Sequence, residues 1–310
     1  MRIGVFVGAS TADLMSLDEL IGRIKQAEED GFDSFWVPHI SARGYDALTV
    51  LALAGTQTSR IELGVGVVPT YPRHPVAMAQ QALTTAAATN ERFLLGLGPS
   101  HRPGIEGSFG LSYDRPALHV REYLSVLRPL MEEGRVRFSG EFYNVNAELD
   151  VLNRHRCPVL ISALAPQMLR LAGQRADGTI TWMAGPKTIR EHITPRINRS
   201  ADASGRDAPR VCVGLPTMVC DDEAAGRRQA AEAYERYGQL VNYRRVLDIE
   251  GVEGPSEVAV IGNEASLRRR LEAFAAGGAT DFMANIFAAE GDGETGPRTY
   301  AALKDLVGRV

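Results

Sequence analysis

Cysteine is scarce in this chain, and its scarcity excludes two kinds of small-protein architecture. Only Cys157, Cys212 and Cys220 occur among 310 residues, and they lie far apart. A disulfide framework or a cysteine-based zinc site needs more cysteines at closer spacing. The three thiols are therefore expected to be reduced and packed as small apolar groups, and no metal-ligand spacing of histidines is found.

Concentrated positive charge is also missing. The 34 lysines and arginines are outnumbered by 38 aspartates and glutamates, which gives a net charge of -4, and no basic run occurs. Nucleic acids and anionic membranes are held by concentrated positive charge. Neither is expected as a partner, and a small-molecule substrate is the remaining expectation.

Long apolar runs are absent as well. The longest, such as residues 3–9 and 65–68, fall far short of the roughly 20 residues that span a bilayer. The first residues lack the basic segment and small-residue cleavage site of a signal peptide. No membrane-spanning helix is expected, and the predicted location is the cytoplasm.

Short apolar strands alternate with helical segments in the first half of the chain. The first short apolar run, within residues 3–9, is predicted to be the first strand. Ser16-Leu17-Asp18-Glu19 after it fits a capping box, which predicts a helix that ends at Gly31. The strand-then-helix pairs that follow are 34–37 with 45–57, 61–67 with 75–89, and 93–97 with 116–131.

The second half continues the alternation. Strands are predicted at 159–161, 179–182, 211–215 and 282–286, with helices near Pro166, Pro186, Glu223, Asn263 and Pro297. Eight nearly continuous apolar strands separated by helices indicate a parallel sheet that is covered by helices. The predicted fold is an α/β (β/α)8 TIM barrel.

A doubly wound open sheet is the competing fold. Gly64-x-Gly66 and Gly96-x-Gly98 do not complete the GxGxxG pattern of dinucleotide-binding sheets, and no GxxxxGK[ST] phosphate loop occurs. The barrel is therefore preferred. We predict one domain over residues 1–310, with an added hairpin near 135–146 and a late insertion near 239–258.

Active sites of such barrels lie at the C-terminal ends of the strands, which selects a small set of residues. Exposed first amides of the helix near Pro166 are suited to a phosphate. Ser100 to Pro103 has a solvated loop as its alternative reading, and His74 before Pro75 is expected to start a helix. The selected residues are His39, Gly66, Val67, Gly98, Ser100, His101, Ala163, Leu164, Ala165, Pro166, Gln167 and Trp182.

At these positions the chain resembles the luciferase-like monooxygenase superfamily, in particular its branch that depends on the deazaflavin coenzyme F420. The resemblance spans nearly all 310 residues. The segments that carry it are 63–69 with Arg73-His74-Pro75, 92–102, Ser112-Tyr113-Asp114-Arg115-Pro116 with Arg121-Glu122-Tyr123, and 169–173 with Ala176-Asp177-Gly178. Each segment alone is weak, but their order together is specific.

The resemblance implies a flavin or deazaflavin in the mouth of the barrel. It implies a non-prolyl cis peptide between Gly66 and Val67 that supports the ring, and a phosphate-binding loop at 163–167. His39 and His101 are the implied acid/base candidates and cofactor contacts. Gly98, Ser100 and Trp182 complete the expected cofactor site, and a homodimer is compatible with the family.

Two departures from the family pattern leave the proton donor open. Some deazaflavin enzymes carry a glutamate where this chain has His101, and an acidic residue where it has Gly8-Ala9-Ser10. The leading hypothesis is an F420-dependent oxidoreductase that transfers hydride. Its alternatives are an FMN-dependent monooxygenase, a non-catalytic flavin-binding protein, and a cofactor-free barrel lyase or isomerase.

Overall fold

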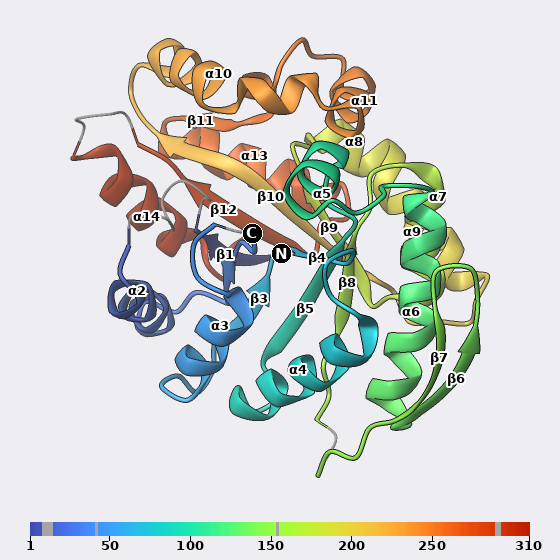
Figure 1. Ribbon diagram of the computed structural model, residues 1–310. Helices are drawn as coiled ribbons and strands as arrows, with labels where there is room; N and C mark the ends of the chain where they lie inside the picture. The colour runs from blue at the N-terminus through green and yellow to red at the C-terminus, as the bar shows by residue number, and fades with distance from the viewer. Residues whose placement is uncertain (8–14, 41–42, 153–154, 289–292) are drawn as a thin grey trace.

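Eight parallel strands close into a barrel in the computed structural model, which describes residues 1–7, 15–40, 43–152, 155–288 and 293–310 (Figure 1). Each strand pairs with the next, and the last pairs with the first, so the predicted TIM barrel is confirmed. The strands are β1 (Arg2–Phe6), β2 (Ser34–Val37), β3 (Glu62–Val65), β5 (Phe93–Gly98), β8 (Val159–Ser162), β9 (Gly178–Trp182), β10 (Arg210–Val219) and β12 (Asp281–Ile286).

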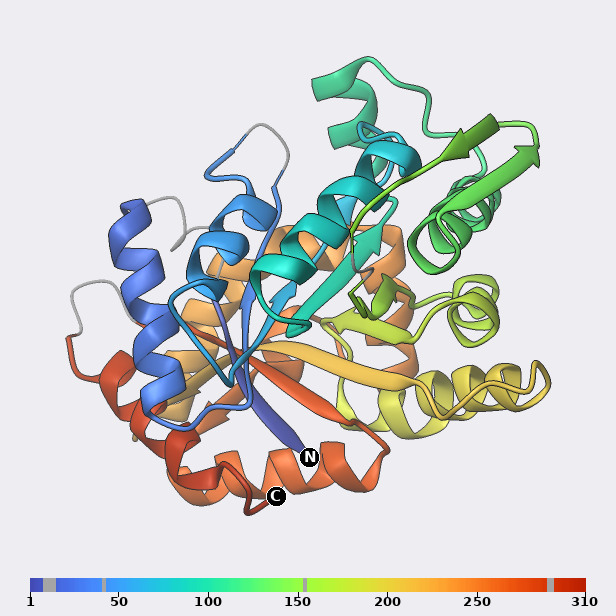
Figure 2. The same cartoon turned by 90° about the horizontal axis from the view of Figure 1, so that it is seen from below.

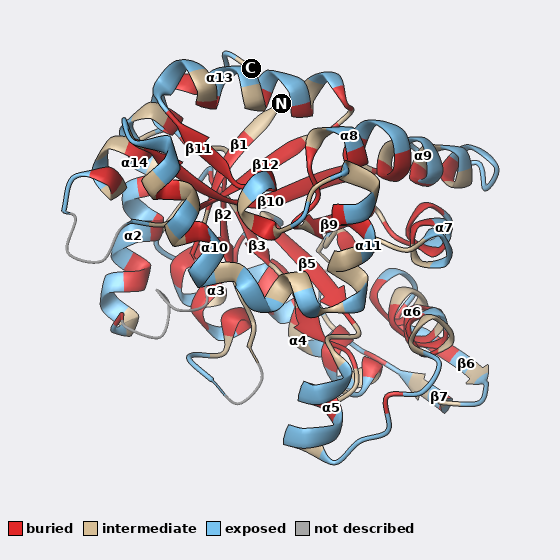
Figure 3. Cartoon of the chain, turned by 90° about the horizontal axis from the view of Figure 1, so that it is seen from above, coloured by how far each residue is buried: buried red, intermediate tan, exposed pale blue. Residues whose placement is uncertain are grey.

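Helices surround the barrel. Figure 3 shows buried strands at the centre and helices whose outer faces are exposed, and Figure 2 shows the same ring from the opposite side. The helices that follow the barrel strands are α2 (Leu17–Glu29), α3 (Ala47–Gly55), α4 (Pro75–Ala88), α6 (Pro116–Glu132), α7 (Pro166–Arg175), α9 (Thr194–Asp202), α13 (Glu264–Ala276) and α14 (Thr295–Leu306).

Several helix starts obey the local signals in the sequence. The Ser16 hydroxyl accepts a hydrogen bond from the Glu19 N–H, and the Glu19 carboxylate accepts one from the Ser16 N–H, which completes the capping box. His74 caps α4 by accepting from the Val76 N–H at 3.3 Å. The predicted helix-starting role of His74 is therefore confirmed.

Alternate residues of the strands face two different cores. Phe93, Leu95 and Leu97 of β5 pack outward into the large core beneath the helices. Leu94 faces inward, where it joins a compact cluster that fills the barrel interior. The other buried members of that interior cluster are Trp36, Leu160, Ile180, Cys212 and Met283.

Further elements depart from the regular alternation. Strands β6 (Arg135–Ser139) and β7 (Asn144–Glu148) form the predicted antiparallel hairpin beside α6. The segment of the predicted late insertion holds α11 (Val241–Glu250) and α12 (Pro255–Val258). The remaining elements are β4 (Val68–Pro69), β11 (Val260–Gly262), α5 (Arg102–Phe109), α8 (Pro186–Thr188), the π turn η1 (Ile189–Ile193) and α10 (Glu223–Gln239).

The loop reading of Ser100 to Pro103 holds for Ser100 and His101 but is wrong for Arg102 and Pro103. Helix α5 begins at Arg102, with Pro103 in its first turn, and ends before Gly110 at φ 64°. Proline is compatible with the first turn because its missing N–H would have no helical partner there. None of the helices in the described ranges has the length and apolarity needed to cross a bilayer.

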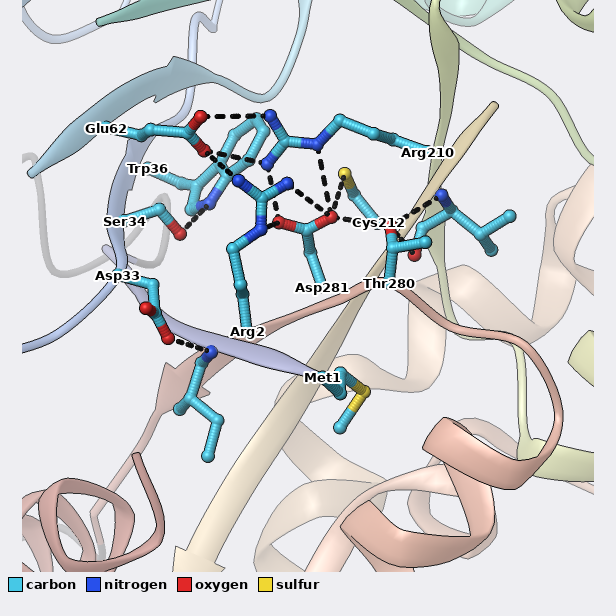
Figure 4. A network of polar contacts seen from close by, with 12 residues as sticks. Met1, Arg2, Asp33, Ser34, Trp36, Glu62, Arg210, Cys212, Thr280 and Asp281 are labelled. Carbon is cyan, nitrogen blue, oxygen red and sulfur yellow. Dashed lines mark hydrogen bonds and ion pairs between the residues drawn. The ribbon is translucent and has the colours of Figure 1, made fainter. Parts of the chain in front are cut away.

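The base of the barrel is closed by a ring of charges (Figure 4). Arg2, Glu62, Arg210 and Asp281 are each the first residue of their strand. Arg2 lies 3.0 Å from Glu62 and 3.1 Å from Asp281, and Arg210 lies 2.8 Å and 2.5 Å from the same two carboxylates. Burial opposes ionisation of Asp281, but the hydrogen bond and charge of Arg210 hold its pKa below its usual value.

Candidate functional site

The C-terminal ends of β3 and β5 meet at the Gly66–Val67 peptide bond, which the family resemblance predicts to support the cofactor ring. The peptide between Gly66 and Val67 is cis, as predicted. Val67 packs against the interior cluster, and a Cβ on Gly98 would lie only 2.8 Å from the Val67 side chain and 2.4 Å from the Ser162 hydroxyl. Glycine at 98 therefore allows three strand ends to approach closely at the floor of the mouth.

Trp182 forms an aromatic wall beside this floor. Its ring lies edge-on to Phe6 at 5.8 Å and to Tyr237 at 5.9 Å between centroids. Its indole N–H is buried and has no hydrogen-bond partner among the residues that the structure describes. A buried donor without a partner is costly, which makes it a candidate contact for a ligand acceptor.

His39 follows β2 and is held by the start of α3. Its Nδ1 accepts from the Ala47 N–H at 3.4 Å and lies 3.9 Å from the Asp46 carboxylate, which is itself paired with Arg73. Burial, and then the positive charge of Arg73, lower the pKa of His39, while Asp46 opposes this shift. His39 is therefore a neutral imidazole near pH 7.

His101 precedes α5, and its side chain contacts helix α11. Its ring lies 5.6 Å from that of Tyr243 on α11. Burial, and then the charge of Arg236, lower its pKa. The neighbouring Ser100 has φ 61°, and its carbonyl accepts from the Tyr113 hydroxyl at 2.8 Å. This hydrogen bond holds the backbone that presents His101.

Residues 163–165 join β8 to α7, and Pro166 and Gln167 begin that helix, so the predicted phosphate-binding segment spans a loop and a helix N-terminus. Ala165 is the N-cap of α7 and provides no side-chain cap, and Pro166 follows it. The first amides of the helix are consequently left to other partners. His192 donates from Nε2 to the Leu164 carbonyl at 2.7 Å and ties the loop to the π turn.

Sequence reasoning missed the residues that α10 brings to the mouth. Tyr234 and Tyr237 lie three positions apart on one face of α10, and both rings contact Trp182. The Tyr234 hydroxyl donates to Asn285 at 2.9 Å, and Asn285 donates to the Phe6 carbonyl at 3.2 Å. The i, i+3 spacing of the tyrosines was the available signal.

The site contains no metal centre among the described residues, since no group of three histidine, cysteine or acidic side chains there could hold an ion. Gly8-Ala9-Ser10, the second departure from the deazaflavin pattern, lies outside the described residues. Two histidines, an aromatic wall and free helical amides thus characterise the described part of the mouth.

A closed parallel barrel with these groups at the C-terminal ends of its strands has the arrangement of a TIM-barrel enzyme that binds its ligand there. The chain belongs to the luciferase-like monooxygenase family, whose sequence model matches residues 1–308. The predicted resemblance is confirmed, and the chain is assigned to a family of oxidoreductases and monooxygenases.

Relatives of this chain include proteins named for different chemistries. The 5,10-methylenetetrahydromethanopterin reductase of Methanolobus tindarius is 29% identical over 266 residues, which cover 85% of this chain and 79% of that protein. The structure of the coenzyme F420 dependent tetrahydromethanopterin reductase from Methanopyrus kandleri covers 98% of this chain and 96% of its own, with TM-score 0.76 and 21% identity.

A monooxygenase shares the same fold. The oxygenating constituent of 3,6-diketocamphane monooxygenase from Pseudomonas putida, in complex with FMN, has TM-score 0.76 at 15% identity and covers 99% of this chain and 96% of that chain. The barrel therefore accommodates proteins of both cofactor types, and the fold alone does not select one.

Proposed function

We propose that this chain is a deazaflavin-dependent oxidoreductase that transfers hydride between coenzyme F420 and a small organic substrate. The observation that carries the proposal is the similarity to a methylenetetrahydromethanopterin reductase over 85% of the chain. The motifs at the mouth also resemble the F420-dependent branch. When bound, the deazaflavin supplies the redox chemistry by donating or accepting hydride at C5.

The described mouth fits such a cofactor. Val67 and Phe6 provide apolar surface for a planar ring beside Trp182. The unpartnered indole N–H of Trp182 offers a hydrogen bond to a ligand acceptor. The uncapped first turn of α7 offers backbone amides to a phosphate. These groups bind and orient more than they react.

His39 is the proposed contact with the substrate oxygen. Because Nδ1 accepts from the Ala47 N–H, the neutral imidazole carries its proton on Nε2. A donor at Nε2 stabilises the negative charge that develops on an oxygen when a carbonyl is reduced. Asp46, 3.9 Å from Nδ1, would stabilise an imidazolium form. His101, also neutral, is the second acid/base candidate.

Equilibrium binding tests the choice of cofactor. The purified apoprotein is titrated with F420 and with FMN at equal ionic strength, and candidate carbonyl and alcohol substrates are then screened by the absorbance of the preferred cofactor. We expect tighter binding of F420 and substrate-dependent hydride transfer without oxygen uptake. Tighter FMN binding with oxygen-dependent turnover would establish the monooxygenase alternative instead.

Three further expectations accompany this proposal. The substrate is a small organic molecule, the protein is cytoplasmic, and it assembles as a homodimer. Size-exclusion chromatography with light scattering tests the assembly, and a monomer at micromolar concentration would contradict it. The family assignment favours an enzyme over the non-catalytic flavin-binding alternative.

A further inference from the structure

The segment from η1 to Arg206 ties down helix α7 at three points. His192 donates to the Leu164 carbonyl at 2.7 Å, the Ser200 hydroxyl to the Arg170 carbonyl at 2.8 Å, and Arg206 to the Ala176 carbonyl at 3.1 Å. Between these points Gly173 lets α9 approach, because a Cβ there would lie 2.4 Å from the Ile197 carbonyl. Only the first of these hydrogen bonds reaches the loop before α7.

Pro195 explains why the chain forms a π turn next to His192. A proline has no N–H, so it cannot donate to the Glu191 carbonyl four residues earlier. Arg196 donates instead to the carbonyls of Glu191 at 3.3 Å and His192 at 3.0 Å. The Thr194 N–H bonds back to Ile189, five residues earlier. The π turn is the local feature that carries His192.

Backbone carbonyls of the loop before α7 contact side chains from other elements. Leu164 accepts from His192. The Thr179 hydroxyl donates to the Ile161 carbonyl at 3.0 Å and lies 3.4 Å from the Ala163 carbonyl. A carbonyl only accepts, so Nε2 of His192 carries a proton. In a trans peptide the C=O and the following N–H point in opposite directions. The N–H groups of Leu164 and Ala165 are therefore turned away from these two side chains.

The N–H groups of Leu164 and Ala165 add to the unpaired N–H donors in the first turn of α7. The N–H groups of Leu164, Ala165, Gln167 and Met168 have no hydrogen-bond partner in the described part of the chain, whereas Leu169 donates to Ala165 at 2.9 Å. Free amides at the positive end of a helix are the groups that a phosphate uses. The direction of the Ala165 N–H depends on the hydrogen bond that His192 makes to the Leu164 carbonyl of the same peptide.

We propose that His192 is a positioning residue for the phosphate-binding loop at 163–167, and that its hydrogen bond to Leu164 keeps the Ala165 N–H directed at the cofactor phosphate. This inference rests on the proposed function, but it is independent of the choice between F420 and FMN because both carry a phosphate. His192 itself does not touch the ligand. It acts through the peptide that it holds.

Paired ligands with and without phosphate provide the test. Dissociation constants are measured for F420 and for the phosphate-free deazaflavin that carries only the ribityl chain, and likewise for FMN and riboflavin. His192→Ala should weaken binding of the phosphate-bearing member by about 3- to 10-fold, the value of one displaced hydrogen bond. Binding of the phosphate-free member should stay unchanged.

Three variants distinguish a positioning effect of His192 on the phosphate-binding loop from a general contribution to the stability of the fold. His192→Gln keeps an N–H donor and should restore the preference for phosphate, whereas His192→Phe fills the volume without a donor and should not. Ser200→Ala removes another hydrogen bond between α9 and α7 and should leave the preference intact. If His192→Ala does not fold, the Gln and Phe variants make the same comparison.

The outcomes that overturn the proposal differ from those that overturn the function. Equal losses for both members of a ligand pair, an effect of Ser200→Ala as large as that of His192→Ala, or no loss at all would reject the role of His192. A wild-type protein that binds both members of each pair equally would reject the phosphate site itself. Thermal unfolding of each variant shows whether a loss of affinity reflects a loss of fold.

Discussion

Buried polar groups are paired at the base of the barrel, whereas at its mouth a buried donor is unpaired among the described residues. At the base, Arg2, Glu62, Arg210 and Asp281 pair with one another, and Asp281 is only 1% exposed. At the mouth, the buried indole N–H of Trp182 has no partner within the described ranges. The eight strands therefore begin at an ionic ring whose charges pair with one another and end near a buried donor that none of the described groups pairs with.

Histidine protonation reveals the same asymmetry. Burial lowers the pKa of each of four histidines that lie on the mouth side or support it, namely His39, His101, His119 and His192. At the base, the ionic ring keeps its carboxylate charged, since the pKa of Asp281 is lowered. Charge thus closes the base, whereas neutral imidazoles that can donate or accept surround the mouth.

The largest effect is expected at the mouth, on turnover. His39→Ala should lower turnover by about 100-fold to 10,000-fold with cofactor saturating, because an acid/base or hydrogen-bond donor is removed. Its free energy of unfolding should change by about 1 kcal/mol or less. His74→Ala is the control, since that residue caps α4 and its ring contacts Tyr143. Wild-type turnover in His39→Ala would remove this residue from the mechanism.

A comparable effect, but on stability, is expected at the base. Asp281→Ala leaves Arg2 and Arg210 with Glu62 alone and should cost about 3–5 kcal/mol in the free energy of unfolding, because a buried pair is broken from one side. Turnover per folded molecule should be unchanged. Denaturant unfolding and active-site titration measure both quantities, and a variant as stable as wild type would contradict the closing role of the ring.

Acid should weaken the mouth side before the base. His119 on α6 is 3% exposed, hydrogen-bonds to Thr70 at 3.1 Å, and burial lowers its pKa to about 4. The unfolded chain binds this proton first, near pH 6.5, so the stability contribution is complete above pH 6.5 and declines by about 3 kcal/mol as the pH falls to 4.

His119→Phe tests this assignment, because it removes the titrating group while keeping a buried ring. Its unfolding free energy should depend less steeply on pH between 6.5 and 4 than that of the wild type. Parallel profiles for the two proteins would show that other groups carry the acid sensitivity.

The smallest effect is expected for Trp182 at the mouth, where a substitution should not lower the free energy of unfolding, in contrast to Asp281 at the base. Trp182→Phe removes a buried N–H that none of the described protein groups pairs with, so the free energy of unfolding should be equal or higher. Affinity for the cofactor should fall by about 2- to 10-fold if that N–H binds the ligand. Calorimetric binding and thermal unfolding measure the two quantities. Lower stability with unchanged affinity would place Trp182 among the structural groups.

Much of the architecture follows from local patterns that the sequence displays directly. Apolar segments and helix caps such as Ser16 predicted the strands and helices of the barrel, because these signals involve neighbouring residues. Helix α5 was missed because the prolines and glycines at 99–104 also fit a loop. The π turn before α9 was missed because its five-residue backbone hydrogen bond from Thr194 to Ile189 arises next to Pro195, while the freed Glu191 carbonyl accepts from the side chain of Arg196.

Some residues of the candidate site were predicted from the sequence, and others were found only in the structure. Strand ends and family motifs predicted the positions of His39, His101 and the loop at 163–167, and the cis peptide at Gly66 is confirmed. Their functional roles stay predictions until binding and turnover are measured. Tyr234 and His192 entered only with the structure, since each reaches the site from an element distant in sequence.

The amino-acid sequence alone determined that this chain alternates strands and helices, and it located most strand ends closely, although β10 continues beyond the predicted 215 to Val219. Only the tertiary structure decided which side chains share a layer inside the barrel. Arg2 and Arg210 meet Glu62 and Asp281 because closure sets the register between strands far apart in the chain. Local periodicity assigns a residue to the inner or outer face, but the stagger of a closed sheet selects its neighbours there.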